Sequence, residues 1–228
     1  MEKEKIAQKA LVEKKQKIEL LAKINHEVRT PISSILMYFE MLEDGSLNSQ
    51  DDVGKYSQTV KTSLQRLLNT INNFVDYAKI ETGKLEVEND LFNLNEEVEN
   101  TVELLKPLAR YKNNEIEIIN NNHSHLLVYS DPVKYRQILI NIIANAVRFT
   151  TNGKIKVTYE NLHISEDLYE IKTSVEDTGP GIPKDKLESI FNPFVLLKQE
   201  DKINFGSGLG LTICNEFVHV CKLVTFIL

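Results

Sequence analysis

The first 83 residues carry a helical pattern with two apolar seams. Lys and Glu dominate residues 1–24, which contain no Gly or Pro, so this stretch is predicted to form a solvated helix. Apolar residues then recur at alternating steps of four and three, which is typical of helices that pack along one seam. The first seam comprises Val28, Ile32, Ile35, Phe39 and Leu42, and the second comprises Val60, Leu64, Leu67, Ile71, Phe74 and Ala78.

Two helices with one seam each would leave apolar surface in water if they stood alone. The polar stretch 43–54 between the seams is a loop by composition, and Thr82-Gly83 is expected to end the second helix. Dimerisation into a four-helix bundle would bury both seams. The pattern therefore predicts a helical hairpin over 21–83 that forms a homodimer, preceded by a charged linker helix over 1–20.

From Lys84 onward the pattern is mixed. Strand-like runs occupy 85–92, 115–119, 126–129, 154–160 and 168–176, with a polar link over 161–167. Helical patterns cover 95–111 and 132–147, and the second has Asp131 at its cap and Pro132 in its first turn. This mixture predicts an α+β domain over 84–228, with helices covering one face of a sheet.

The composition argues against nucleic-acid-binding and membrane-spanning proteins. A chain of 228 residues with 42% apolar and 26% charged residues suits a globular protein. The net charge of −6 argues against a nucleic-acid binder, and no apolar run approaches the ~18–20 residues that span a bilayer. The charged N-terminus has no signal-peptide core. Cys214 and Cys221 are not expected to pair, which favours a reducing, cytoplasmic compartment.

The first chemical cluster runs from His26 to Pro31 on the first predicted helix. His26 lies at the edge of the seam, so its imidazole should be exposed, and Glu27 can hold one ring nitrogen protonated while the other attacks phosphorus. Pro31 cannot donate to the carbonyl of Glu27 and should bend the helix, at a cost of about 3 kcal/mol. Taken alone, the cluster also fits a surface histidine on a kinked helix.

The second cluster is a pair of asparagines, Asn141 and Asn145, four residues apart on one helix face. Side-chain amides on an otherwise apolar helix need partners, and a Mg²⁺ ion that carries triphosphate oxygens would be one. Arg148 could meet phosphate as a fork donor. The bland alternative is a pair of buried amides that cap neighbouring backbone.

The third cluster, Asp177-x-Gly179-x-Gly181, leaves a strand and enters a turn. A buried carboxylate here could accept a hydrogen bond from an exocyclic amine such as that of adenine. The glycines would let the backbone approach the base closely. An ordinary Gly/Pro turn is the alternative.

The fourth cluster holds three glycines, Gly206, Gly208 and Gly210, at the entry to an apolar helix. This arrangement presents backbone N–H groups and a helix N-terminus to phosphate. It is neither a Rossmann fingerprint, because no strand runs directly into it, nor a Walker loop, because it lacks Gly-Lys-Ser/Thr.

Together, in this order, the clusters resemble a sensor histidine kinase over roughly residues 20–213. The correspondence covers the phosphoacceptor box at His26–Pro31, the asparagine box at 137–150, the first glycine box at 177–181, the phenylalanine box at 190–194 and the second glycine box at 206–210. The resemblance implies a dimerising two-helix domain followed by an ATP-binding domain of the kind shared with Hsp90, MutL and gyrase. It also implies a cytosolic location, as a whole protein or as part of a larger sensor.

The resemblance assigns roles to the residues that match. Asn145 would hold Mg²⁺, Asn141 and Arg148 would contact the phosphates of ATP, and Asp177 would recognise adenine. Glu27 would assist His26 as a base, and Thr30 would help to orient water during dephosphorylation of a partner. The implied activity is autophosphorylation of His26, followed by transfer to an aspartate on the receiver domain of a response regulator.

One position separates branches of this fold on physical grounds. The relatives that hydrolyse ATP carry a glutamate four residues before the metal-binding asparagine, where it acts as general base for water. This chain has Asn141 there, and an amide cannot accept a proton at neutral pH. The pocket is therefore predicted to favour transfer to His26, which argues against a third hypothesis, an ATP-driven clamp.

The C-terminus departs from the family pattern. The family follows its second glycine box with a helix, a glycine turn and two closing strands, whereas only 17 residues, none of them Gly or Pro, follow Leu211 here. Residues 222–228 could form one strand, and a sheet without its last strands would expose an edge. The rival hypothesis is therefore a catalytically inactive module that dimerises or binds nucleotide without turnover.

Overall fold

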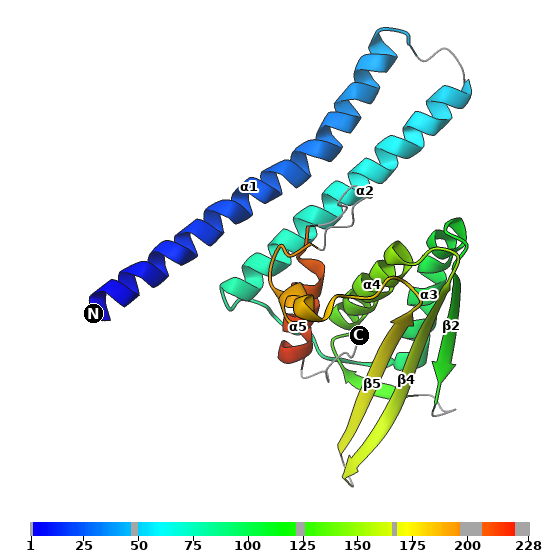
Figure 1. Cartoon of the computed structure of the whole chain (residues 1–228). Coiled ribbons are helices and arrows are strands. Elements are labelled where there is room, and N and C mark those ends of the chain that lie inside the picture. Colours follow the sequence, from blue (N-terminus) through cyan, green and yellow to red (C-terminus); the bar gives the residue numbers. More distant parts are fainter. Residues whose placement is uncertain (1, 47–49, 122–125, 166–167, 197–206, 222–228) are drawn as a thin grey trace. The chain divides into compact units, whose positions relative to one another are not determined.

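The computed structural model describes residues 2–46, 50–121, 126–165, 168–196 and 207–221 (Figure 1). The chain groups into two compact units, Met1–Lys79 with Leu196–Leu209, and Ile80–Val195 with Gly210–Leu228. No helix among the described residues has the length and apolar content that crossing a bilayer requires.

The first unit is built on an antiparallel helical hairpin (Figure 1). Helix α1 spans Glu2–Glu43 and helix α2 spans Gln50–Glu81, so the predicted loop at 43–54 is wrong for its last five residues. Two aspartates, Asp51 and Asp52, lie in the first turn of α2, where carboxylates favour the helix N-terminus. The predicted end of α2 is confirmed, because Gly83 has a φ of +64° and its N–H donates to the Ile80 carbonyl at 3.0 Å.

Helix α1 runs without interruption from the charged N-terminal stretch through Pro31. The ring of Pro31 is buried, and its nitrogen has no hydrogen to donate to the helix. Two hydroxyl groups, one before and one after Pro31, each donate to a carbonyl one turn earlier in the helix. Thr30 Oγ1 donates to the His26 carbonyl at 3.1 Å, and Ser34 Oγ donates to the Thr30 carbonyl at 3.2 Å. The proline therefore leaves α1 a single helix.

The apolar seams of the hairpin are only partly covered within one chain. Ile32, Phe39, Leu64 and Ile71 remain 39%, 52%, 45% and 43% exposed. Contacts between α1 and α2 include a hydroxyl pair, Tyr38 Oη and Ser57 Oγ, at 3.3 Å. The seams therefore keep apolar surface for a further partner, as the pattern predicted.

The second unit contains a mixed three-stranded sheet of order β2-β4-β5. Strand β2 (Glu115–Asn120) lies parallel to β4 (Lys154–Ser165), and β4 pairs antiparallel with β5 (Leu168–Asp177). The predicted link at 161–167 is wrong for 161–165, because β4 continues to Ser165 and pairs with β5, with a register shift between His163 and Ser165. The predicted hairpin itself is confirmed.

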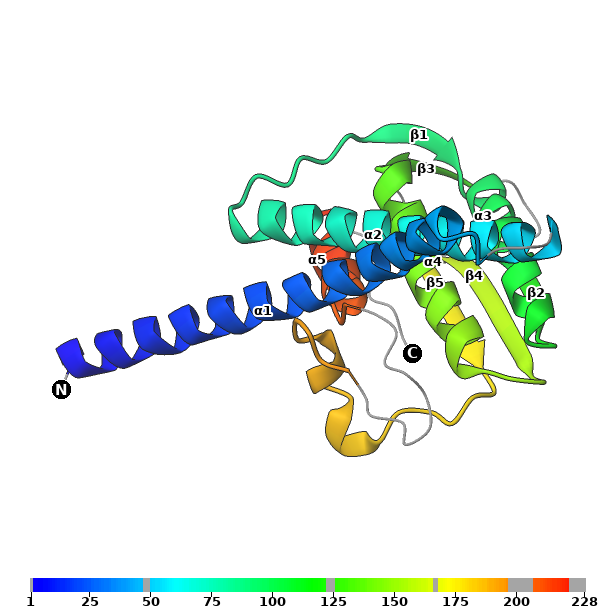
Figure 2. The ribbon, with the colours of Figure 1, turned by 90° about the horizontal axis from the view of Figure 1, so that it is seen from above.

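Strands β1 (Asp90–Asn93) and β3 (Leu127–Ser130) form a separate antiparallel pair (Figure 2). The predicted strand at 85–92 is therefore wrong for 85–89. Pairing with the four-residue β3 ends at Ser130, and the N–H of Glu88 donates instead to the carboxylate of Asp131.

Helices α3 (Leu94–Tyr111) and α4 (Pro132–Phe149) cover one face of the three-stranded sheet (Figure 1), and α5 (Gly210–Val220) packs on α4. Two short 3₁₀ turns, η1 (Lys184–Lys186) and η2 (Ser189–Phe191), precede α5. Large side chains with at most 1% exposure from all these layers form the core, namely Leu94, Val98, Val102, Ile138, Leu139, Ile143, Val147, Ile155, Val157, Tyr159, Ile213 and Phe217. The predicted layer of helices on a sheet is confirmed.

The two cysteines do not form a disulfide, as predicted. Burial raises the pKa of the Cys214 thiol to about 12 and that of Cys221 to about 11. Both thiols therefore stay protonated at neutral pH, which makes them poor nucleophiles.

Asp131 caps α4 and joins it to the segment before β1. The residue is 1% exposed, and its Oδ1 accepts hydrogen bonds from the N–H groups of Val133 and Lys134, both at 3.0 Å. Its Oδ2 accepts from Glu88 N at 3.0 Å and from Lys134 Nζ at 2.7 Å. Burial opposes ionisation of Asp131, but these donors outweigh it and lower the pKa of the carboxyl.

We expect Asp131→Ala to lower the free energy of unfolding by about 1–3 kcal/mol at pH 7, because it removes a helix cap and leaves buried donors unpaired. Since folding lowers the pKa of Asp131, its stabilisation is complete above the unfolded value of about 3.9 and is lost as the pH falls through the folded value. Urea denaturation of wild type and variant from pH 7 to pH 3 measures this difference.

The matched control is Asp185→Ala, since Asp185 is exposed in η1. It should change the unfolding free energy little at any of these pH values. A stability gap between wild type and Asp131→Ala that stays constant down to pH 3 would contradict the role of the ionised cap.

Candidate active site

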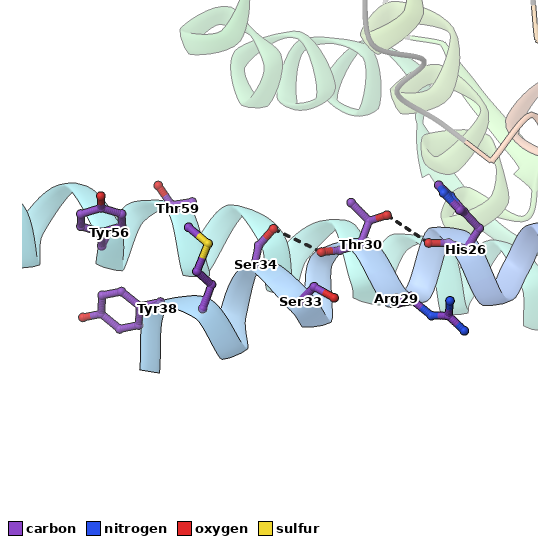
Figure 3. A pocket seen from close by; sticks show the side chains of 9 residues that line it. His26, Arg29, Thr30, Ser33, Ser34, Tyr38, Tyr56 and Thr59 are labelled. Carbon is purple, nitrogen blue, oxygen red and sulfur yellow. Dashed lines mark hydrogen bonds between the residues drawn. The ribbon is translucent and has the colours of Figure 1, made fainter. Parts of the chain in front are cut away.

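His26 lies at one end of a groove of about 440 Å³ on the helical hairpin (Figure 3). The predicted exposure of His26 is confirmed, and Figure 3 shows its imidazole pointing away from the side chain of Arg29. The residues that line the groove are His26, Arg29, Thr30, Ser33, Ser34, Met37, Tyr38, Tyr56 and Thr59. An imidazole in this position is open to a phosphoryl donor from solvent.

Glu27, the next residue on α1, is half-buried beside the seam. Burial raises the pKa of its carboxyl, and the positive charges of Lys23 and His26 oppose that rise only in part. A carboxylate with a raised pKa is a stronger proton acceptor, which suits a base that assists the imidazole. The predicted role of Glu27 is therefore compatible with its surroundings.

Thr30 is exposed one turn after His26, and its hydroxyl proton is committed to the His26 carbonyl. The hydroxyl oxygen can still accept a hydrogen bond from water. The helix thus fixes the orientation of Thr30, while its predicted action on water stays a prediction.

Helix α4 positions the asparagine pair because the apolar residues around the pair are buried. Leu139, Ile142 and Ile143 are 0–4% exposed against the sheet and α5, while Asn141 and Asn145 are half-exposed. The amide nitrogen of Asn141 is buried, and its one polar neighbour identified among the described residues is the Cys214 thiol, to which it donates only weakly. A side-chain amide has two N–H donors, so a weak bond to sulfur leaves Asn141 with capacity for a stronger acceptor.

The first residue of α5, Gly210, lies against that amide. A Cβ on Gly210 would be 3.5 Å from Asn141 Oδ1 and 3.6 Å from Asn141 Cγ, so the backbone of α5 begins in contact with the side chain. The first N–H groups of a helix have no partners within the helix and favour an anion. The structure therefore brings Asn141 together with the last glycine of the fourth cluster.

The other two glycines of that cluster are less informative. Gly208 has a φ of +68°, a conformation that favours glycine, and precedes Leu209, whose N–H donates to Ser207 Oγ at 3.2 Å. Gly206 lies outside the described residues. The predicted phosphate contacts of both stay predictions.

Arg148 lies two turns after Asn141 on α4 and is half-buried. Its guanidinium carbon is 5.9 Å from the centre of the Phe149 ring, and its carbonyl accepts a hydrogen bond from Lys112 Nζ. The side chain is thus held near the C-terminal end of α4. A direct contact between Arg148 and phosphate remains a prediction.

Asp177, the last residue of β5, is exposed, so the expectation of a buried carboxylate is wrong. The strand ends here, and only one oxygen is engaged. Oδ1 accepts from Gly179 N at 2.7 Å and from Thr150 Oγ1 at 3.2 Å, whereas Oδ2 makes no hydrogen bond within the described ranges. The carboxylate is therefore oriented through one oxygen and open at the other.

The glycines after Asp177 differ in what they do. A Cβ on Gly179 would lie 2.6 Å from Asp177 Oδ1 and 3.0 Å from the Phe149 carbonyl, so only glycine fits there. Gly181 has open space around it and a φ of +70°, which favours glycine for its backbone. The first glycine cluster is thereby tied to the C-terminal end of α4.

The two candidate subsites share α4 as their support. Asn141 meets α5 in the middle of the helix, and Phe149 meets Gly179 at its end, about 12 Å further along at 1.5 Å per residue. Sequence reasoning missed Thr150, which bonds to Asp177. A threonine just past a helix gives no local signal of a partner 27 residues away.

Comparison with known proteins agrees with this arrangement. The model for the His Kinase A (phospho-acceptor) domain matches residues 16–83. The model described as histidine kinase-, DNA gyrase B-, and HSP90-like ATPase matches residues 130–224. The two models thus match the helical hairpin and the part of the α/β layer from residue 130 onward, in that order.

Curated relatives are sensor kinases. The chain is 35% identical over 213 residues to the autoinducer 2 sensor kinase/phosphatase LuxQ of Vibrio vulnificus. The aligned region covers 91% of this chain and 24% of LuxQ. It is 32% identical over 211 residues to the sensor protein GacS of Pseudomonas syringae, covering 92% of this chain and 23% of GacS. The chain thus spans about a quarter of the length of these relatives.

Solved structures of histidine kinases share the fold. The catalytic domain of histidine kinase ThkA is 32% identical, with a TM-score of 0.50 over 59% of this chain and 82% of that one. ThkA in complex with the response regulator protein TrrA is 29% identical, with a TM-score of 0.63 over 90% of this chain and 55% of that one. The chain therefore belongs to the sensor histidine kinase family, with a phosphoacceptor hairpin followed by an ATPase-type α/β layer.

Proposed function

We propose that this chain is an ATP-dependent kinase core that phosphorylates its own His26 and passes the phosphoryl group to an aspartate of a response regulator. The observation that carries the proposal is the junction of α4 and α5, where the side-chain amide of Asn141 lies next to the N-terminus of α5 at Gly210. Its domains would be a linker helix over 1–20, a dimerising phosphoacceptor hairpin over 21–83 and an ATP-binding domain over 84–228.

ATP would lie along α4. The open Oδ2 of Asp177 would accept a hydrogen bond from the exocyclic amine of adenine, and Gly179 and Gly181 would let the backbone approach the base. The triphosphate would reach the α5 N-terminus, where the Asn141 N–H and free backbone N–H groups would donate to it. Arg148 would add positive charge on the same helix.

The amides of α4 fit a Mg²⁺ ion bound mainly through phosphate. Within the described part of the chain, no group of three or more His, Cys, Asp or Glu side chains could hold a metal by itself. Asn145 would contribute its amide oxygen, one turn after Asn141. The bound ion would neutralise charge on the triphosphate.

The transfer itself would form a bond between a ring nitrogen of His26 and the γ-phosphorus, and would break the bond from that phosphorus to the ADP oxygen. Glu27 would hold the proton on the other ring nitrogen, so that the attacking lone pair stays available. Asn141, an amide, cannot deprotonate water, so the site favours the imidazole as acceptor.

The partially covered seams of α1 and α2 support a homodimer. Ile32, Phe39, Leu64 and Ile71 keep 39–52% of their surface exposed, and burial against a second hairpin would remove this area from water. ThkA has been solved with a response regulator, which supports a receiver domain as the second partner. Since LuxQ is named a kinase/phosphatase, Thr30 would orient water for hydrolysis of the phosphorylated aspartate of the partner.

His26→Gln should abolish autophosphorylation, because glutamine has no nucleophilic lone pair of this kind. Incubation with γ-labelled ATP and Mg²⁺ should give wild-type protein an acid-labile, base-stable label, and the variant none, with ATP binding unchanged. His219→Gln, on exposed His219 of α5, is the matched control and should label as wild type. Label that persists in His26→Gln would refute the acceptor, and unlabelled wild type that binds ATP would support the inactive module.

Glu27→Gln should lower kcat for autophosphorylation by about 10²–10⁴-fold with little change in KM for ATP, because it removes a base. Since burial raises the pKa of Glu27, the ionised base should be present above that raised value and lost as the pH falls through it. The acid limb of the wild-type pH–rate profile should therefore be shallower in the variant.

Glu40→Gln, on an exposed glutamate of the same helix, is the control and should keep the wild-type profile. An unchanged acid limb in Glu27→Gln would show that the carboxylate does not take part.

Asn145→Ala should raise the Mg²⁺ concentration needed for half-maximal ATP binding about tenfold or more, because one oxygen ligand is lost. Calorimetric titration with ATP, at several Mg²⁺ concentrations and without Mg²⁺, would measure this change. The affinity for ATP without the metal should change far less. The control is Asn100→Ala, because Asn100 is an exposed asparagine on α3. Equal losses with and without Mg²⁺ would exclude Asn145 as the metal ligand.

A further inference from the structure

A buried asparagine outside the motifs supports the adenine end of the site. Asn114 follows α3, immediately before β2, and is 6% exposed. Its side chain makes three hydrogen bonds to the backbone around the C-terminal end of α4, more than 30 residues away in sequence. A buried amide with this many partners fixes the backbone that it touches.

The three hydrogen bonds hold both ends of the loop at residues 150–153, which follows α4. Asn114 Nδ2 donates to the Thr150 carbonyl at 2.9 Å and to the Val147 carbonyl at 3.4 Å. Asn114 Oδ1 accepts from Gly153 N at 3.1 Å. The backbone at both Thr150 and Gly153 is therefore fixed relative to one side chain.

The opposite side of the same loop packs on the turn after β5. A Cβ on Gly153 would overlap Thr178 Oγ1 and would lie 2.6 Å from Thr150 Cγ2, so the loop and the turn are in close contact. Thr178 Oγ1 in turn accepts from Lys154 N at 3.0 Å. The loop is thus held between Asn114 and the turn that follows Asp177.

Thr150 connects the fixed loop to the carboxylate of Asp177. Its hydroxyl donates to Asp177 Oδ1 at 3.2 Å, while its own carbonyl is bonded to Asn114. Asp177 is exposed at the end of a strand, and the torsion of its carboxylate is broad, so the bond from Thr150 adds a second restraint to the one from Gly179 N at 2.7 Å. With Oδ1 engaged by both donors, Oδ2 makes no hydrogen bond within the described ranges and is able to accept one.

We propose that Asn114 is a positioning residue for base recognition: through Thr150 it orients Asp177 so that Oδ2 accepts the exocyclic amine of adenine. This inference rests on the proposed function, in which Asp177 contacts adenine. Asn114 does not touch the nucleotide. Its effect should therefore be confined to the part of the affinity that depends on the amine.

The experiment compares two nucleotides on the full chain with Mg²⁺. ATP carries the 6-amino group, and purine riboside 5′-triphosphate lacks it. Wild type should bind ATP about tenfold or more tightly than the analogue, the size expected for a hydrogen bond to a charged acceptor. Asn114→Ala should reduce this ratio to within about threefold, chiefly through weaker ATP binding, with far smaller loss for the analogue.

A matched pair at Thr150 tests the same link without disturbing the buried amide. Thr150→Val removes the hydroxyl and should lose the discrimination as Asn114→Ala does, whereas Thr150→Ser keeps a hydroxyl and should retain it. Asn113→Gly is the neighbouring control, since Asn113 has a φ of +55°, which glycine accepts, and bonds only to exposed Asn152 through its side chain. Circular dichroism and thermal melting confirm folding.

The outcomes separate the two proposals. If wild type does not discriminate between the nucleotides, the adenine role of Asp177 fails and the inference on Asn114 falls with it, whereas phosphorylation of His26 is decided separately by the labelling experiment. If wild type discriminates and the folded Asn114→Ala and Thr150→Val variants keep the full ratio, only the inference on Asn114 is overturned. Should Asn114→Ala not fold, the Thr150→Val and Thr150→Ser pair decides.

Discussion

The burial of α4 is the constraint on which the candidate site depends. The apolar side chains in its middle are buried against the sheet and the neighbouring helices α3 and α5, so the helix cannot rotate without exposing core residues such as Ile138 and Ile143. Asn141 and Asn145 therefore stay on the same side of the helix, even though the buried Asn141 nitrogen has only the weak acceptor Cys214 beside it. Packing free energy thus holds a polar pair where isolated amides would be unfavourable.

Both ends of α4 are fixed by polar side chains rather than by apolar packing. At the N-terminus, the Asp131 carboxylate gathers donors from α4 and from Glu88. At the C-terminus, the Asn114 side chain donates to the Thr150 carbonyl and accepts from the Gly153 N–H. A helix with buried sides and two bonded ends is a rigid support, and rigid supports hold a binding geometry better than loops.

The sequence predicted the helices and most strands, because seams, caps and alternation are local signals. The cap at Asp131 and the stop at Gly83 were read directly from residue type. Errors arose where partners decide: residues 85–89 alternate like a strand, yet β3 offers no partner beyond Ser130. The Thr150–Asp177 contact likewise depends on two loops that only the folded sheet brings together.

The donor and acceptor of the proposed reaction lie in separate compact units, so each must be complete by itself. The acceptor unit supplies an exposed imidazole and, in Glu27, a carboxylate that burial makes more basic. The donor unit supplies N–H donors and amides but, at Asn141, no base for water. ATP bound there would therefore meet no competent nucleophile until an imidazole arrives, which keeps the phosphoryl group for transfer rather than hydrolysis.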